Sequence, residues 1–197
     1  MAFQLVFDVA AAYSLSKLRP VLGNVILGMM LLTLMIPSTV LIIPQYVTVI
    51  DLPILHINLL DSPFAIWLPT IANAFNIFLL KRFFDSIPEE LMSAARVDGA
   101  SPLRTLWSII LPMSRPILGV VSIFAVTAIW KDFLWPKLVM PSPETRTVSV
   151  GIYAFAGGTG QNVVVAAAVI AAIPTVIFFL IFQKNIMSGL TTGSLKG

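Results

Sequence analysis

Long apolar segments constrain what this chain can fold into more than any other feature. Four of them stand out, at residues 20–43, 64–80, 117–134 and 163–182. A helix needs about 20 apolar residues to cross the hydrocarbon core of a bilayer, which is about 30 Å thick. Because only 11% of the chain is charged, it has too few polar side chains to cover a water-facing surface. The sequence therefore predicts an all-α, polytopic membrane bundle with four full transmembrane helices in a single domain, residues 1–197.

Two of these segments contain a proline, Pro37 in the first and Pro174 in the fourth. We expect helices to tolerate both, because neighbouring helices can satisfy the carbonyls that proline frees. Residues 1–15 are also apolar, but about 14 residues at about 1.5 Å each reach only about 21 Å, which is too short to span. They predict a partial helix. A complete chain starting here would leave Asp8 and a free amino terminus in hydrocarbon, so we expect an N-terminal truncation.

The basic residues predict the orientation. Nine of the twelve lie in alternate connections and at the tail: Lys17, Arg19, Lys81, Arg82, Arg96, Arg104, Arg115, Lys184 and Lys196. Because Lys and Arg concentrate on the cytoplasmic side of membrane proteins, these connections and the C-terminus are predicted to be cytoplasmic. The connection 44–63, which has no Lys or Arg, is then outside. The chain contains no cysteine, which excludes disulfides and thiolate metal sites, and we expect no metal site.

Residues 85–112 are the most polar part of the chain and read DSIPEELMSAARVDGASPLRTLWSIILP. Ser86 with Glu89 three residues later has the pattern of a capping box that opens a first helix. Gly99 is the expected stop, because glycine adopts the left-handed conformation without a steric penalty. Ser101 and Pro102 suit the N-cap and first turn of a second helix.

In that second helix, four apolar side chains are expected to share one face: Leu103, Leu106, Trp107 and Ile110. The 85–112 segment is thus predicted to be two short capped helices. One interpretation is an amphipathic hairpin on the inner leaflet, and the other is a docking element for a cytoplasmic protein. A lipid-bound helix would be richer in Lys and Arg, which favours the protein partner.

The same segment resembles the cytoplasmic "EAA" loop of binding-protein-dependent ABC importer permeases. That pattern is Glu-Ala-Ala, three residues, Gly, about nine residues, then Ile-x-Leu-Pro. This chain reads Ser93-Ala94-Ala95-Arg96-Val97-Asp98-Gly99, then Ile109-Ile110-Leu111-Pro112. Further matches look like the maltose-type subfamily, which imports carbohydrates: Ile36-Pro37, Ile43-Pro44, Trp130 to Pro136, Gly189-Leu190-Thr191 and Lys196-Gly197. Two positions depart from the pattern, Ser93 in place of glutamate and Lys131 in place of asparagine.

The resemblance implies a MetI-like permease subunit in a bacterial or archaeal inner membrane, surrounded by lipid. It implies three kinds of partner, a second permease, a cytoplasmic ABC ATPase dimer and an extracytoplasmic solute-binding protein, and no nucleic acid. The residues implied for ATPase docking are Glu90, Ser93, Ala94, Ala95, Asp98 and Gly99. Because Glu90 lies three residues before Ser93 on the same helix face, we hypothesise that its carboxylate replaces the missing glutamate.

ATP would be bound by the partner, since the chain has no Gly-x₄-Gly-Lys-Ser/Thr phosphate loop and we expect no cofactor of its own. Candidate residues for the translocation pathway are Asn73, Asn76, Trp130, Asp132 and Trp135. For the asparagines, helix–helix hydrogen bonding is the alternative role. For Asp132, the alternative is an interfacial position beside Lys131.

Two other functions compete with the permease of an importer. An ion-gradient-driven secondary carrier would hold ionisable residues near mid-membrane and show internal repeats. A membrane enzyme would need a cluster of acid, base and nucleophile at one depth. The spans are nearly free of acids at their centres, and the single histidine, His56, lies in an outer connection, so we expect neither a carrier nor an enzyme with catalytic residues.

Overall fold

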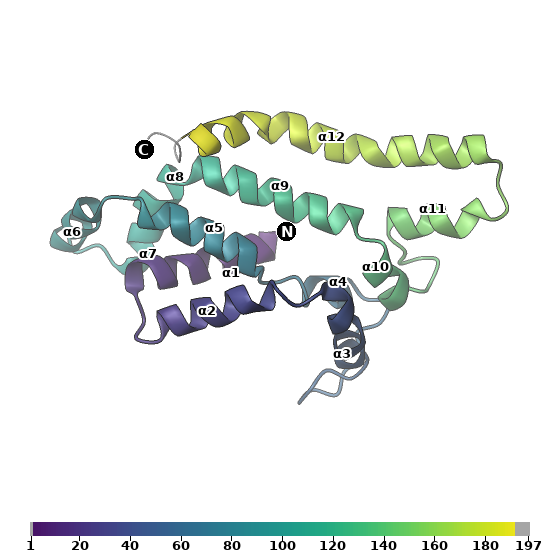
Figure 1. Cartoon of the computed structure of the whole chain (residues 1–197), viewed down its shortest axis with the longest axis horizontal. Helices are drawn as coiled ribbons and strands as arrows, with labels where there is room; N and C mark the ends of the chain where they lie inside the picture. The colour runs from purple at the N-terminus through teal and green to yellow at the C-terminus, as the bar shows by residue number, and fades with distance from the viewer. Residues whose placement is uncertain (1, 192–197) are drawn as a thin grey trace. The chain divides into compact units, whose positions relative to one another are not determined.

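The computed structural model describes the backbone of residues 2–191 and the side chains of residues 2–183. Within that part of the chain the regular elements are all helices and no strand occurs, which confirms the predicted all-α fold. The helices are drawn in Figure 1. They belong to two compact units that alternate along the sequence. Unit 1 takes residues up to 35, 72–124 and 181 onward, and unit 2 takes 36–71 and 125–180. The side chain of Lys184 and the motif Lys196-Gly197 lie outside the described residues.

Unit 1 holds the N-terminal helix and the polar 85–112 segment. Its elements are α1 (Ala2–Tyr13), the π-helical turn η1 (Ser14–Leu18), α2 (Gly23–Thr33), α5 (Ala74–Asp85), α6 (Glu89–Val97), α7 (Pro102–Thr105), the π-helical turn η2 (Leu106–Ile110), α8 (Leu111–Met113) and the first part of α9 (Arg115–Lys131). Helix α1 packs along α5, and the buried core joins side chains from both to the 85–112 segment: Val9, Tyr13, Leu80, Phe84, Met92, Leu106 and Ile110.

Helix α1 has the polarity of a membrane helix. The face that it buries includes the polar side chains of Gln4 and Asp8, whereas the apolar Phe3, Val6 and Phe7 are exposed. In water the reverse would be expected, because exposed apolar surface is costly. A helix that turns polar groups inward and apolar groups outward is suited to hydrocarbon.

Unit 2 contains α3 (Ser38–Ile50), α4 (Pro63–Trp67), α10 (Leu134–Val139), α11 (Val148–Ala156) and most of α12 (Gln161–Thr191). Helix α10 packs on α3 and α4 around a small core that includes Val49, Ala65 and Trp135. The indole N–H of Trp135 donates to the Ala65 carbonyl at 3.0 Å, so this buried polar group is satisfied.

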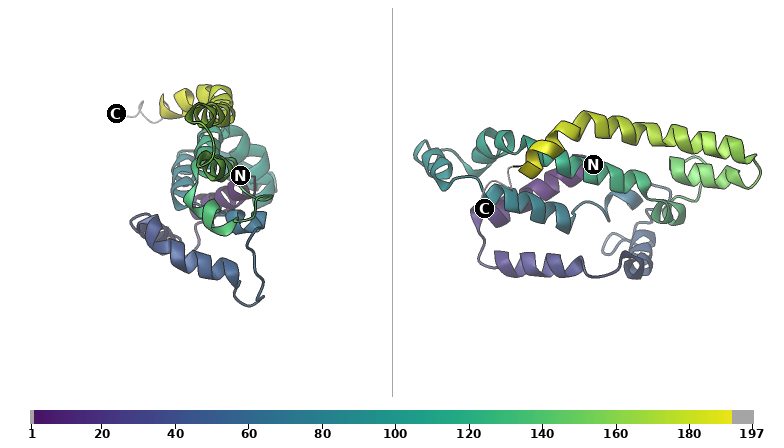
Figure 2. Two further views of the ribbon diagram at one scale, coloured as in Figure 1. Left: turned by 90° about the vertical axis from the view of Figure 1, so that its right-hand side faces the viewer. Right: turned by 45° about the horizontal axis from the view of Figure 1, so that its top comes forward.

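Length and composition show which helices could cross a membrane. Helix α12, drawn as one long helix in Figures 1 and 2, qualifies alone over Gln161–Gln183. None of the residues in its apolar window is buried within the described part of the chain. Two bent pairs of helices, α2 with α3 and the 102–113 stretch with α9, bring the number of spans among the described residues to three if each pair counts as one. Pro174 lies inside α12, so the expectation that this helix tolerates its proline is confirmed.

The first predicted span, 20–43, is not one continuous helix. Helix α2 ends at Thr33 and α3 begins at Ser38, with Pro37 between them. Proline lacks an N–H and disfavours the helical conformation of the residue before it, and here it ends the helix, so the expectation that it is tolerated was wrong.

The second predicted span, 64–80, is also divided. The short helix α4 stops at Trp67, and α5 starts only at Ala74, after an irregular stretch that contains Pro69. Helix α9 covers most of the third predicted span but ends at Lys131, before Asp132. The depth of each segment in the bilayer, and the grouping of all spans in one domain, stay predictions.

Candidate functional site

The hairpin of α6 and α7 in unit 1 is built from local signals that the sequence carries. Gly99 has a φ of +70°, and its N–H donates to the Arg96 carbonyl at 3.0 Å. The next N–H, of Ala100, reaches the Ala95 carbonyl at 2.9 Å. These two bonds form a Schellman motif, which confirms Gly99 as the stop of the first helix.

The second helix also begins as expected. The Ser101 hydroxyl oxygen accepts a hydrogen bond from the Arg104 N–H at 3.3 Å, and Pro102 occupies the first turn. The predicted capping box, in contrast, was wrong. Because α5 runs on to Asp85, Ser86 caps the C-terminal end of that helix and donates to the Phe83 carbonyl at 2.6 Å.

The apolar face predicted for the second helix is divided by η2. Leu106 and Ile110 are buried in the unit 1 core, whereas Leu103 and Trp107 are each 69% exposed. A π-helical turn places more residues in each turn than an α-helix does, so it rotates the side chains relative to the α-helical spacing used for the prediction. The hairpin therefore anchors through one pair and presents the other pair at its surface.

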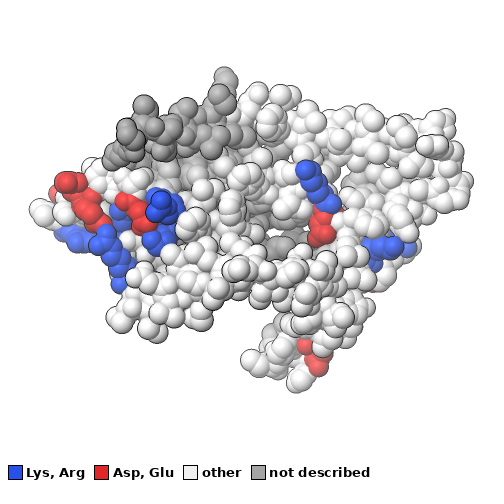
Figure 3. Space-filling view, in the orientation of Figure 1, with Lys and Arg blue, Asp and Glu red and all other residues white. Residues whose placement is uncertain are grey.

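The residues implied for docking lie mostly on that surface. Glu90, Ser93, Ala94, Asp98 and Gly99 are exposed. Only Ala95 is buried, where it packs α6 onto the core. Among the described residues, neither the Glu90 carboxylate nor the Ser93 hydroxyl has a hydrogen-bond or ion-pair partner. Charged side chains of both signs gather around α6 and the end of α5 (left in Figure 3).

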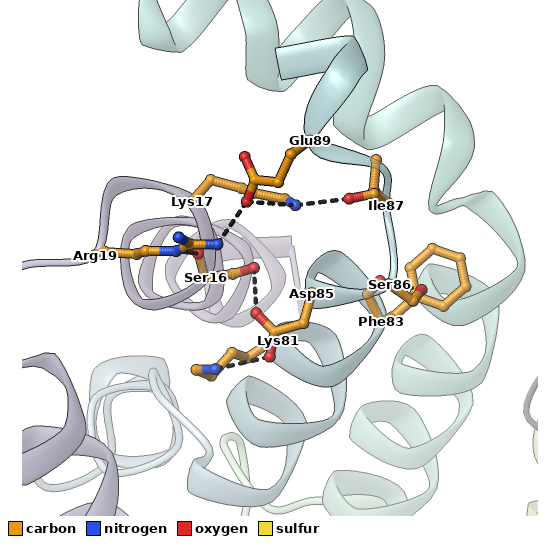
Figure 4. Close-up of polar contacts among 9 residues, drawn as sticks. All are labelled: Ser16, Lys17, Arg19, Lys81, Phe83, Asp85, Ser86, Ile87 and Glu89. Carbon is orange, nitrogen blue, oxygen red and sulfur yellow. Dashed lines mark hydrogen bonds and ion pairs between the residues drawn. The ribbon is translucent and has the colours of Figure 1, made fainter. Parts of the chain in front are cut away.

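Residues 13–19 hold the hairpin from outside the 85–112 segment. The Tyr13 hydroxyl donates to the Pro102 carbonyl at 3.0 Å, and the Ser16 hydroxyl donates to Asp85 at 2.7 Å. The Lys17 ammonium donates to the Ile87 carbonyl at 2.9 Å. The Arg19 guanidinium pairs with the Glu89 carboxylate (Figure 4). From the sequence, Lys17 and Arg19 were predicted only to mark the cytoplasmic side, since no motif links them to residues about 70 positions away.

A small pocket lies between these two parts of unit 1. It has a volume of about 130 Å³ and is lined by Tyr13, Lys17, Leu18, Met92, Arg96, Ala100, Pro102 and Thr105. Two of these lining side chains, Lys17 and Arg96, carry positive charge. A cavity of this size would hold a single side chain or a few waters, which is smaller than usual cofactor sites.

Asn73 and Asn76 form a polar cluster with Asp8. Asn73 is the N-cap of α5, and its side-chain oxygen accepts from the Asn76 N–H at 3.0 Å. The Asp8 carboxylate is fully buried and accepts from the Asn73 N–H at 2.8 Å and from the Asn76 amide at 3.1 Å. These bonds join α1 to α5, so the geometry favours the helix-joining role for both asparagines. The Asp8 carboxylate is thus enclosed by protein.

The remaining candidates for the pathway lie in unit 2 and line different pockets. Trp130 donates its indole N–H to the Ala171 carbonyl at 2.9 Å and lines an open pocket of about 410 Å³ with alanines of α12. Asp132 and Trp135 line another, of about 340 Å³, together with Ser38, Thr39, Gln45 and Thr70. Asp132 is half-buried and has no hydrogen-bond or ion-pair partner among the described residues.

A second carboxylate of unit 2 joins two connections. The Asp61 oxygens accept from the Ser142 N–H at 3.0 Å, the Ser142 hydroxyl at 2.8 Å and the Thr145 hydroxyl at 2.7 Å. The bond from the Ser142 backbone, followed by the two hydroxyl bonds, holds the pKa of the Asp61 carboxyl below its usual value, because all three stabilise the charged form. This role of Asp61 was not predicted from the sequence.

No group of three or more His, Cys, Asp and Glu side chains that could hold a metal ion occurs among the described residues.

Comparisons with known proteins relate this geometry to a family. Residues 9–191 match the family described as "binding-protein-dependent transport system inner membrane component". The chain is 35% identical over 189 residues to the sn-glycerol-3-phosphate transport system permease protein UgpE of Yersinia pestis, with 93% of this chain and 65% of that protein covered. It is 42% identical over 125 residues to the maltodextrin transport system permease protein MdxG of Bacillus subtilis, with 62% and 45% covered. The chain thus spans less than two thirds of the length of these curated relatives.

A solved structure shares the fold. One chain in the crystal structure of a bacterial ABC transporter involved in the import of the acidic polysaccharide alginate superposes with a TM-score of 0.80. It is 26% identical in sequence, and the match covers 94% of this chain and 70% of that one.

Proposed function

This chain belongs to the family of binding-protein-dependent transport system inner membrane components, and from that premise we propose that it is the permease subunit of an ATP-driven importer. The observation that carries the proposal is the α6–α7 hairpin. The end of α6 and the start of α7 are both capped. The hairpin is anchored in the core of unit 1 and presents Glu90, Ser93 and Trp107 at the surface. A linker exposed to water needs no such construction, whereas an element that docks into a groove does.

The partners follow from this role. A cytoplasmic ABC ATPase dimer binds the hairpin and hydrolyses ATP, because the chain itself has no phosphate loop. A second permease completes the pathway, and a solute-binding protein delivers the solute from outside. The subunit is multi-pass in a bacterial or archaeal inner membrane, with its C-terminus cytoplasmic, as the distribution of Lys and Arg predicts.

For the solute we propose a sugar or a related small polar compound. The relatives are named for glycerol phosphate and maltodextrin transport, and the related structure for alginate import. The pocket of Asp132 suits such a solute, since it combines a carboxylate with hydroxyl and amide groups and with the ring of Trp135. The relatives do not favour the ion-gradient carrier.

The test is a pull-down of the full-length protein from its native membrane in mild detergent. We expect an ATP-hydrolysing subunit and a second permease to co-purify, each identified by mass spectrometry. Gly99→Pro is expected to remove the ATPase, because proline cannot adopt a φ of +70° and has no N–H to donate to the Arg96 carbonyl. Gly158→Ala, at a glycine with open space around it, is the control. A chain that purifies alone would overturn the proposal.

A further inference from the structure

Four side chains near the end of α1 form a clamp on the 85–112 segment, and we call Tyr13, Ser16, Lys17 and Arg19 the N-terminal clamp. They contact the end of α5, the link from α5 to α6, the first residue of α6 and the first residue of α7. Figure 4 shows Ser16, Lys17 and Arg19 reaching across from η1 and from the residue that follows it. One short stretch of chain therefore contacts the start of both helices of the proposed docking element and the end of the helix that precedes them.

Lys17 is the least exposed charged group of the clamp. Only 4% of its side chain is accessible, and its ammonium lies 2.9 Å from the Ile87 carbonyl and 3.8 Å from a Glu89 oxygen. Burying an ammonium group is costly unless it is paired and hydrogen-bonded, so these partners fix its position. The Arg19–Glu89 pair is different, because the arginine is 70% exposed, and exposed pairs contribute little.

The Ile87 carbonyl, which accepts from Lys17, lies at the break between two helices. Helix α5 ends at Asp85 and α6 begins at Glu89, so Ile87 lies in the short link between them. The N–H groups of Ser86 and Ile87 bond back to Phe83 and Phe84, which joins the link to α5. A carbonyl left without a helical partner at such a break needs a donor, and Lys17 supplies it from another helix.

The backbone of η1 orients side chains of the N-terminal clamp. A π-helical turn over Ser14–Leu18 is followed by Arg19 in the left-handed conformation, with a φ of +48°. The Arg19 N–H returns to the Ser14 carbonyl at 2.9 Å and closes this turn. Turns of this kind recur at functional positions, where their cost is balanced by the contacts that they allow.

We propose that Lys17 is a positioning residue that joins α6 to α1, so that a movement imposed on the docking hairpin reaches α1 as well as α5. The inference rests on the proposed function, since the movement is that of a docked ATPase. Without the ammonium, α6 would still be attached to the core through Met92 and Ala95, but its link to α5 could turn relative to α1.

The experiment uses the full-length protein, assembled with its ATPase and second permease. Residues 1–197 contain no cysteine, so Val6→Cys on α1 and Leu91→Cys on α6 introduce the two sites for spin labels in this part of the protein. Pulsed electron–electron double resonance then gives the distribution of distances between the two spin labels, without nucleotide and with ATP and vanadate. We expect one narrow distribution in both states. Lys17→Met is expected to about double its width with ATP and vanadate, and Lys17→Arg to restore it.

Lys81→Met is the matched control. Lys81 is a second lysine of the same cluster, and its ammonium bonds Asp85 at 2.8 Å within α5 itself, so its loss leaves α1 and α6 joined. If Lys17→Met and Lys81→Met give equal distance distributions with the ATPase bound, the inference about Lys17 is overturned and the proposed function is not affected. Failure of the wild-type chain to bind an ATPase would instead refute the proposed function.

A second measurement does not depend on the folding of the lysine variants. Ser16 and Asp85 are in contact through their side chains, so Ser16→Cys with Asp85→Cys offers a pair for oxidation. If the N-terminal clamp stays closed throughout the cycle, the disulfide forms at the same rate without nucleotide and with ATP and vanadate. A rate at least tenfold lower in the ATP–vanadate state would mean that the clamp opens, which contradicts the proposal.

Discussion

Replacing Gly99 with alanine should loosen the α6–α7 hairpin by an amount that the structure allows to be estimated. A Cβ at Gly99 would meet no atom within 4 Å, so no steric clash contributes. The whole cost comes from the backbone, whose φ of +70° is left-handed. For a residue with a Cβ, that conformation costs about 1–2 kcal/mol.

Amide hydrogen exchange of the hairpin is the direct assay. The Ala100 N–H is protected by its bond to the Ala95 carbonyl and exchanges when the hairpin opens. A cost of about 1–2 kcal/mol corresponds to about five- to thirtyfold faster exchange at this amide, since about 1.4 kcal/mol is tenfold. Gly99→Asn should accelerate it less, because asparagine tolerates the left-handed region better than alanine does.

Gly158→Ala is the matched control. It also has open space around its Cβ, but its φ is not left-handed, so it should leave the exchange of Ala100 unchanged. The reasoning would be refuted if Gly99→Ala exchanged like the wild type, or if Gly99→Asn exchanged as fast as Gly99→Ala. Either result would mean that the left-handed backbone does not limit the stability of the hairpin.

Three further predictions concern other parts of the chain. If Glu90 supplies the acceptor missing at Ser93, Glu90→Ala should weaken ATPase binding about tenfold and Ser93→Ala only about threefold, because charged hydrogen bonds are the stronger ones; equal binding of Glu90→Ala and wild type would contradict this. The pKa of Asp61 is lowered on folding, so its contribution to stability is complete above the unfolded pKa of about 3.9 and is lost as the pH falls through the lower folded value. The difference in melting temperature between wild type and Asp61→Asn should therefore shrink below about pH 3.9, and a difference that grows there would contradict the prediction. Trp135→Phe leaves the buried Ala65 carbonyl without its donor and should lower the free energy of unfolding in detergent by about 1–3 kcal/mol. Trp107→Phe, at an exposed position, should change it by no more than about 0.5 kcal/mol, and equal changes for the two variants would refute the role of the indole hydrogen bond.

The candidate site shows which signals could be read from the sequence. The stop at Gly99 and the cap at Ser101 were predicted because each acts over at most five residues. Ser86 was misassigned, since it suits both the start of α6 and the end of α5, and only the length of α5 decides between them. Pro37 was misjudged for a related reason: proline is tolerated inside a span in α12 but ends the helix between α2 and α3.

The sequence by itself determined the class of solvent, the all-α fold and the capped turn between α6 and α7. These follow from hydrophobic segment length, charge content and capping residues, which act on neighbouring positions. Only the tertiary structure decided that Asp8 pairs with Asn76 and that Lys17 reaches Ile87, contacts between residues 68 and 70 positions apart. No local pattern specifies such pairs. They form because a buried polar group must find a partner, and which partner is within reach depends on how α1 packs against α5.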